Sequence, residues 1–376
     1  MLFAHRLKSA LICALAMFAL LGGGKASAAE EEVFEIRNIA VDVKAETAAA
    51  ARALALREAE QKAFETMLAR LTLRQDRQNI PILNRADIAG YVRDFSVAQE
   101  KTSSVRYIAR LNYRFKPEPI RELLRAYNVP FAETSSKPML VLPVFESAAS
   151  AVLWDEPNPW RLAWQQRDAP DGLVPLIVPI GDLNDIVTIG AADALAGSSL
   201  KLATLADRYA ATGSIVAHLN LITVDPATGA ETSTITLLRP FDPIPVEARS
   251  ATLIQLSNED MPVFMARAVE DTVSRINELW KRRNLISNVG TGVLAVTVPI
   301  GGLTDWLKIK KQLAGIGIIR RTEIVLLSRE QVRVNVHFAG GAEQLMTALE
   351  QANLSLLQES GEWLVMPIGA FQPPKG

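Results

Sequence analysis

The chain of 376 residues has one cysteine, Cys13, and three histidines. Cys13 lies in an apolar run near the N-terminus. If that segment is removed, disulfides, cysteine nucleophiles and cysteine-bound metals are all excluded. His218 and His337 lie in stretches expected to be strands, and neither has a second histidine nearby. The spacing of histidine metal sites is therefore absent, and we expect both to be packed strand residues.

Long apolar runs are also missing after the first 28 residues, which have the three parts of a secretory signal peptide. Basic residues come first, the uncharged stretch 10–21 follows, and Ala26-Ser27-Ala28 supplies small residues. Twelve helical residues reach about 18 Å, and a bilayer core is about 30 Å thick. We therefore expect cleavage after Ala28 and a periplasmic product without a transmembrane segment. The alternative is an uncleaved anchor.

Neither sign of charge dominates the chain. Three of the 40 basic residues lie in the signal peptide. The mature chain would therefore have 37 basic and 41 acidic residues, a net charge of −4. Net charge therefore favours neither nucleic acid nor an anionic membrane as a partner. An exported, cysteine-free chain of this length fits a bacterial envelope better than a eukaryotic secretory pathway. No cofactor motif is present, and we expect no cofactor.

The patterns of apolar residues predict an α/β (α+β) protein with three small α/β units. The predicted divisions are a signal peptide at 1–28, an N-terminal domain at 30–132, a central domain at 138–286 and a C-terminal domain at 289–376. The N-terminal order is β-α-β-β-α, with an alanine-rich helix over Glu46–Leu71. The last domain has the order βαββαβ of a ferredoxin-like unit, its final element being one strand or a pair.

The central domain has the most defined patterns. We expect buried strands at Met139–Phe145 and Leu173–Ile180, because both are continuous apolar runs. Helical patterns follow at Asp182–Leu195 and Leu200–Tyr209, and a long helix over Asp260–Arg283 closes the domain. Two strands separate these helices and meet at a turn over residues 225–229.

Three of the six tryptophans lie within twelve residues: Trp154, Trp160 and Trp164. Trp160 and Trp164 are four residues apart on a predicted helix with Asn158 as N-cap and Pro159 in its first turn. If exposed, the pair could form a platform for a glycan or a peptide. If buried, it is a large apolar anchor, which is the interpretation we favour.

Asp182 and Asp185 are three residues apart near a predicted helix start and could share a face. Such a pair could bind a cation or act as acid and base, and helix capping explains it equally well. With Gly181, the aspartates belong to the stretch 178–185, which matches 298–305 at six of eight positions. This repeat has two explanations. It is either a duplicated ligand-binding turn, or the two α/β units use the same local structure to connect a strand to a helix, with Asp182 and Thr304 as N-caps.

One catalytic motif has a partial match. Ser198-Ser199-Leu200-Lys201 fits the S-x-x-K of penicillin-binding enzymes, but the further elements S-x-N and K-T-G are missing. A match of four residues in a chain of this length carries little weight, so we assign no catalytic residue and no metal ligand.

The central domain resembles a known family in four segments. They are Lys137–Val144, the tryptophan segment ending at Trp164, Val178–Asp185 and Leu205–Tyr209. In these the chain looks like the bacterial exported proteins grouped as the domain of unknown function 2066 (DUF2066). The resemblance implies an envelope location and carries no activity.

Two functions from different classes remain open. The first is a non-catalytic binding or assembly module of the periplasm, whose partner is another envelope protein or a cell-wall component. The second is a periplasmic hydrolase or glycan-binding enzyme that uses Asp182, Asp185 and the segment Trp154–Trp164. A weaker third possibility is contact with a membrane surface through the run Lys281–Arg283.

Overall fold

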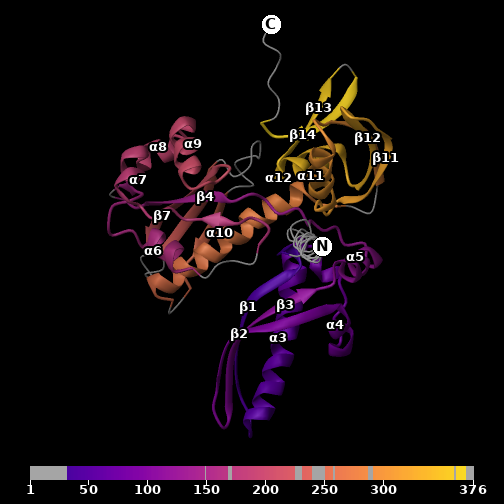
Figure 1. Ribbon diagram of the computed structural model, residues 1–376. Helices are drawn as coiled ribbons and strands as arrows, with labels where there is room; N and C mark the ends of the chain where they lie inside the picture. Colours follow the sequence, from indigo (N-terminus) through magenta and orange to yellow (C-terminus); the bar gives the residue numbers. More distant parts are fainter. Residues whose placement is uncertain are drawn as a thin grey trace, which may run out of the picture.

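A computed structural model describes residues 32–148, 150–167, 172–224, 231–238, 250–256, 259–286, 291–359 and 361–369. The predicted signal peptide, its cleavage after Ala28 and the predicted turn at 225–229 lie outside these residues. The structure confirms the mixed α/β class: three sheets follow one another along the chain, each packed with helices (Figure 1).

The first sheet has the order β1-β3-β2 and is antiparallel. Helix α3 packs on one of its faces, with Ala51, Ala55, Ala59 and Ala63 fully buried. Alanine at every fourth position brings the helix axis close to the sheet. Its elements are β1 (Glu35–Lys44), α3 (Ala48–Leu71), η1 (Arg77–Asn79), α4 (Arg85–Tyr91), β2 (Val92–Thr102), β3 (Arg106–Phe115) and α5 (Pro117–Ala126).

Burial of Tyr113 under α3 makes this unit sensitive to alkaline pH. Its hydroxyl donates to the Leu56 carbonyl at 3.2 Å, and burial raises the pKa of Tyr113 to about 12. The unfolded chain has a tyrosine pKa near 10, so this stabilisation is complete below about pH 10 and is lost by about pH 12. We expect the free energy of unfolding of Tyr113→Phe to fall by about 1–2 kcal/mol less than that of the wild type when the pH is raised through this range.

Urea unfolding of both proteins at about pH 9 and about pH 11 measures this difference. Burial also raises the pKa of Tyr91, Tyr107 and Tyr209, so only the difference between wild type and Tyr113→Phe is informative. An identical loss in the two proteins would contradict the assignment.

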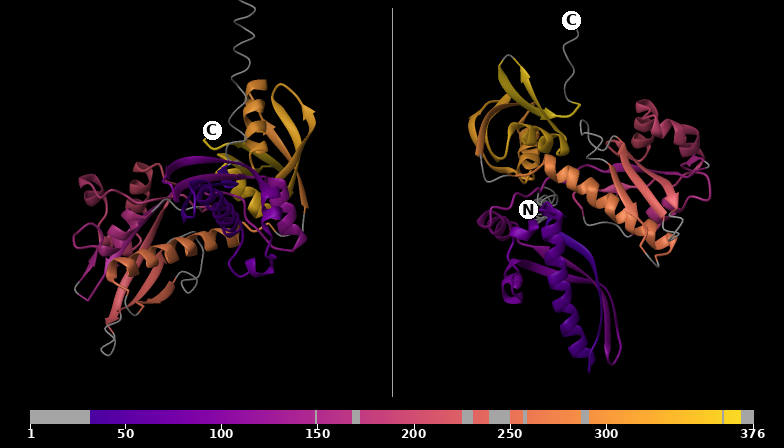
Figure 2. Two further views of the ribbon diagram at one scale, coloured as in Figure 1. Left: turned by 90° about the horizontal axis from the view of Figure 1, so that it is seen from below. Right: turned by 180° about the vertical axis from the view of Figure 1, so that it is seen from behind.

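The central sheet is covered on both faces (Figures 1 and 2). Its strands run β5-β4-β7-β8-β9, with β4 parallel to β7 and the short β6 beside β4. Helices α6 and α10 pack on one face, and α8 and α9 contribute to a separate apolar cluster on the other. Its elements are β4 (Met139–Glu146), β5 (Ala151–Val152), α6 (Pro159–Gln166), β6 (Leu176–Ile177), α7 (Leu183–Thr188), α8 (Ala191–Leu195), α9 (Ser199–Arg208), β7 (Ser214–Val224), β8 (Glu231–Leu238), β9 (Ser250–Ile254) and α10 (Met261–Arg283).

Two predicted elements of this unit are wrong in extent. The single helix expected over Asp182–Leu195 is two short helices, because the chain is extended at Ile189 and restarts at the N-cap Gly190. The strand expected over Leu173–Ile180 pairs with β4 only at β6. Leu173 and Val174 are buried without belonging to a strand, so the apolar run reflected burial alone.

The C-terminal sheet differs in one respect from the predicted ferredoxin-like unit. Its order is β11-β12-β10-β14-β13, and the first three strands are arranged as in a split βαβ unit. The final apolar run forms a hairpin that turns at Gly361 (φ +86°), so β14 lies between β10 and β13 and is parallel to β10. Its elements are β10 (Thr291–Pro299), α11 (Leu303–Ala314), β11 (Ile319–Leu327), β12 (Gln331–Ala339), α12 (Ala342–Gln351), β13 (Leu354–Glu359) and β14 (Glu362–Pro367).

The C-terminal end of α10 joins the central and N-terminal units (Figure 1). Lys281 is buried, and its Nζ donates to the carbonyls of Ala69 (3.0 Å) and Thr72 (2.6 Å) at the end of α3. A cation suits this position because the last carbonyls of a helix carry partial negative charge. The Trp280 indole also donates to the Thr134 carbonyl at 2.6 Å.

A buried carboxylate, Glu133, lies between the N-terminal and C-terminal units. Glu133 accepts from Arg121 of α5 at 2.7 Å, and both side chains are almost fully buried. Arg320 of β11 lies 3.8 Å from the same carboxylate. Across the described ranges, no helix is both long and apolar enough to cross a membrane.

Candidate functional site

Trp160 and Trp164 lie in the protein interior and form no platform. Trp160 is fully buried and Trp164 is 2% exposed. Their rings meet edge to face with centroids 5.7 Å apart, and the Trp160 indole donates to the Ala217 carbonyl of β7 at 2.9 Å. Asn158 caps α6 as predicted, accepting from the Arg161 N–H. The pair anchors α6 to the sheet, which removes the glycan platform from the second hypothesis.

Trp154 lies apart from the other two, beside the turn that precedes α7. Its indole donates to the Ile189 carbonyl at 2.6 Å, and the Arg161 guanidinium lies 5.7 Å from its ring centroid. Arg161 also donates to the Ile180 carbonyl at 2.7 Å. Gly181 has φ +77°, and a Cβ there would lie 2.4 Å from Arg161 Nη2. This turn therefore requires glycine.

Asp182 and Asp185 both bind Arg208, at the end of α9. The Arg208 guanidinium donates to the Asp182 carboxylate and to Asp185 Oδ1 at 2.5 Å. The other oxygen of Asp185 accepts from the Tyr209 hydroxyl at 2.6 Å and from the Gly181 N–H at 2.9 Å. Asp182 is the N-cap of α7, as predicted, and accepts from the Asp185 N–H. We call these four side chains with Gly181 the α7 clamp.

Electrostatics keeps Asp182 and Arg208 of the clamp charged. The hydrogen bond from Arg208, together with that from the Asp185 N–H, holds the pKa of Asp182 well below its usual range. The hydrogen bond between Arg208 and Asp182 also raises the pKa of Arg208. Burial raises the pKa of Tyr209, and its hydrogen bond to Asp185 raises it further. A general acid or base needs a pKa near the working pH, so Asp182 is suited to holding α7 rather than to proton transfer.

The repeated turn has the same hydrogen bond in both copies. The Gly301 N–H donates to Asp305 Oδ2 at 3.1 Å, matching the bond from Gly181 to Asp185. The N-cap of α11 is Gly302, so the prediction of Thr304 is wrong. The helix begins at the position equivalent to the start of α7, because Gly302 aligns with the N-cap Asp182 in the repeat. The two turns therefore have the same local structure, in which the aspartate side chain accepts from the glycine N–H four residues earlier.

The two repeated turns differ in which side chains are buried. In α11 the aspartate of the turn is exposed, and Trp306, Ile309 and Leu313 face the core. In α7 the only buried residue is Asp185, which is fully buried. The large aliphatic side chains of this turn and helix point outward: Ile180 is 67% exposed, Leu183 74%, Ile186 48% and Val187 78%. We call these four side chains the apolar ridge.

The remaining candidates are placed in ordinary structural contacts. His218 lies 2.7 Å from Glu146, and His337 lies 3.0 Å from Glu323. Lys201 of the S-x-x-K match forms an ion pair with Asp193 at 2.7 Å. Because Lys281 is buried against α3, the run Lys281–Arg283 does not offer three cations to a membrane. Within the described residues, no group of three or more acidic, histidine or cysteine side chains could hold a metal.

The sequence predicted both aspartates of the clamp and missed Arg208 and Tyr209. Arg208 is 26 residues from Asp182, and no spacing rule connects a helix end to a turn across two other elements. In the sequence, the one indication of a buried partner was that two aspartates lie among aliphatic residues at the start of a predicted helix. The clamp can hold a short helix in one orientation, and the ridge is the surface that this orientation exposes.

The comparisons with known proteins concern the N-terminal unit. No curated protein matches the chain. The resemblance to DUF2066 is not supported, because the family that matches is a different one. Residues 35–133, which run from β1 through α5 to the buried Glu133, match the family described as Domain of unknown function (DUF8605).

Proposed function

We propose that this protein is an exported, non-catalytic binding module of the bacterial envelope, and that the apolar ridge is its contact surface. The inverted burial of α7 carries the proposal. An aliphatic side chain left in water forgoes about 1.5–3 kcal/mol of burial energy, and a buried carboxylate costs free energy unless it is fully paired. Here three donors satisfy Asp185, so the fold holds the polar side inward and the apolar side outward.

The ridge favours a protein partner over a lipid surface. Charges of both signs lie close to it, because Asp182 at the start of α7 pairs with Arg208. An apolar patch rimmed by mixed polar groups is typical of protein–protein contact sites. A membrane-binding surface would carry an excess of basic residues. The expected occupant is an apolar surface of another exported protein.

Photocrosslinking in the producing cells tests the ridge. A crosslinking amino acid at Val187 is expected to give one discrete adduct with another exported protein, recovered from the periplasmic fraction with the chain beginning at Ala29. The matched control is the same amino acid at Ile82, which is fully exposed in the N-terminal unit. Adding Leu183→Asp is expected to abolish the adduct with the melting temperature unchanged, because Leu183 is already exposed.

Three outcomes would overturn the proposal. One is the absence of any adduct from Val187, and another is the same set of adducts from Ile82. The third is an adduct that survives Leu183→Asp, because the contact would then not depend on the ridge.

A further inference from the structure

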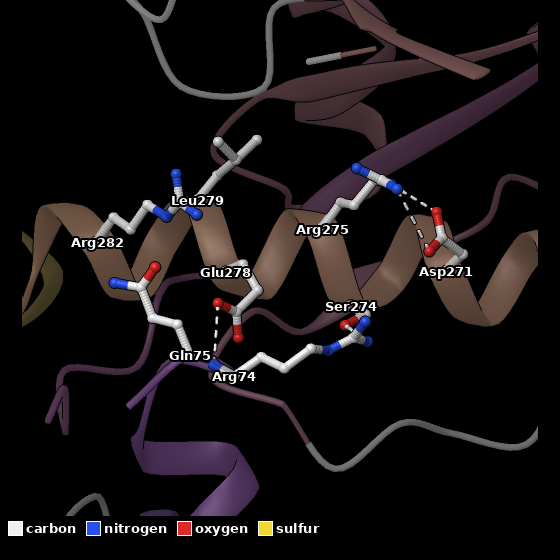
Figure 3. A pocket seen from close by; sticks show the side chains of 8 residues that line it. All are labelled: Arg74, Gln75, Asp271, Ser274, Arg275, Glu278, Leu279 and Arg282. Carbon is white, nitrogen blue, oxygen red and sulfur yellow. Dashed lines mark hydrogen bonds and ion pairs between the residues drawn. The ribbon is translucent and has the colours of Figure 1, made fainter. Parts of the chain in front are cut away.

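A pocket of about 340 Å³ lies where α10 passes the segment that follows α3 (Figure 3). Arg74 and Gln75 line it from the N-terminal unit. The α10 side chains lie opposite: Asp271, Ser274, Arg275, Glu278, Leu279 and Arg282. The volume is at the lower end of the range for ligand sites, so it suits a small molecule or a headgroup.

The carboxylates of the pocket already have cation partners. Asp271 pairs with Arg275 at 2.5 Å, and Glu278 pairs with the buried Lys281 at 2.6 Å. The second oxygen of Glu278 accepts a hydrogen bond from the backbone N–H of Arg74 at 3.4 Å. Glu278 therefore forms part of the wall, with its charge offset from within the protein.

Two guanidinium groups that line the pocket have no such partner. Among the described residues, no ion pair involves Arg74 or Arg282. Arg74 makes a long hydrogen bond to the Ser274 hydroxyl (3.3 Å). Arg77 lies outside the pocket lining, and Glu278 attracts its charge. Figure 3 shows Arg282 beside Gln75 on one side of Glu278, with Arg74 and Ser274 on the other. These are N–H and O–H donors around one hollow.

The cations also repel one another. Burial lowers the pKa of Lys281, its bond to Glu278 raises it, and the charges of Arg77 and Arg74 lower it again. Lys281 is buried, whereas Arg74 and Arg282 are exposed at the mouth of the pocket, and a bound anion would offset the repulsion among these cations. Arginine forks are matched to the oxygens of phosphate and carboxylate groups, and phosphate carries the higher charge at neutral pH.

We propose that this pocket binds a phosphate monoester, with Arg74 and Arg282 as its principal ligands and Gln75 and Ser274 contacting the attached polar group. The ester could be a free sugar phosphate or the headgroup of a lipid. A bound phosphate would connect α10 to the N-terminal unit and stiffen their junction.

Calorimetric titration of the purified protein with glucose 6-phosphate, and with glucose as the uncharged match, tests the proposal. We expect binding of the phosphate ester alone, and about tenfold weaker binding in both Arg74→Gln and Arg282→Gln, since each removes a charged hydrogen bond. Arg283→Gln is the matched control, because Arg283 is exposed on the same helical turn and does not line the pocket. Far-ultraviolet circular dichroism verifies that all variants are folded.

Vesicles of phosphatidylcholine with and without phosphatidic acid separate the two sources of phosphate. Binding of glucose 6-phosphate supports a soluble ligand. Binding only to vesicles with phosphatidic acid, lost in Arg282→Gln, supports a headgroup. If wild type binds neither probe at millimolar concentrations, or if Arg283→Gln weakens binding as much as Arg282→Gln, the pocket is not a phosphate site.

Discussion

Replacing Trp160 by alanine is expected to lower the free energy of unfolding by about 3–5 kcal/mol. The side chain is fully buried, meets Trp164 edge to face, and donates its indole N–H to Ala217 at 2.9 Å. Alanine would leave a cavity between α6 and β7 and would remove the indole hydrogen bond to the Ala217 carbonyl. Chemical denaturation followed by circular dichroism measures the loss.

Leu162→Ala is the matched control for that experiment. Leu162 lies on the same helix and is 51% exposed, so its loss is expected to cost less than about 1 kcal/mol. Comparable destabilisation in both variants would mean that the two positions share one environment, and the assignment of Trp160 as an anchor would be wrong. Glycan binding that depends on Trp160 would restore the platform hypothesis.

Arg121→Met is expected to have the second large effect, about 3–5 kcal/mol. The substitution removes the closer of two arginines from the Glu133 carboxylate, which is 1% exposed, and Arg320 lies 3.8 Å from it. A buried charge without its principal cation is costly because the interior cannot solvate it. Since Glu133 lies between α5 and β11, the loss is expected to be accompanied by faster proteolysis between the N-terminal and C-terminal units.

The control for this pair is Arg125→Met, on the same helix. Arg125 is 36% exposed and lies 3.9 Å from the exposed Glu118, so its removal is expected to change stability by less than about 1 kcal/mol. Denaturant midpoints of the two variants measure the difference. A midpoint for Arg121→Met equal to that of Arg125→Met would exclude a stabilising role for the buried pair.

Helices with long apolar stripes were predictable from the sequence. The pattern over Glu46–Leu71 matches α3, Ala48–Leu71, and the pattern over Asp260–Arg283 matches α10, Met261–Arg283. Each of these helices has one face against a sheet, and packing against a flat partner imposes the 3.6-residue period. The short helix α4 follows a proline-containing polar stretch and has no place in the predicted order β-α-β-β-α. Its single buried side chain, Ile88, is too weak a signal.

The candidate site was predictable only in part. Asp182 as an N-cap follows from local chemistry, because a carboxylate before a helix satisfies free N–H groups within three residues. The direction in which α7 faces does not follow from its sequence. An apolar pattern predicts an inward face, and here Asp185 points inward because Arg208 and Tyr209 meet it there.

By itself, the sequence determined the mixed α/β class, the two long helices, and the caps of α6 and α7. All of these depend on residues within a few positions of one another, where periodicity and capping rules apply. Only the tertiary structure decided that Trp160 and Trp164 are interior, that β14 enters the last sheet beside β10, and that α7 turns its aliphatic side outward. These outcomes depend on partners far away in the chain, and no local pattern specifies which distant side chain will satisfy a buried charge.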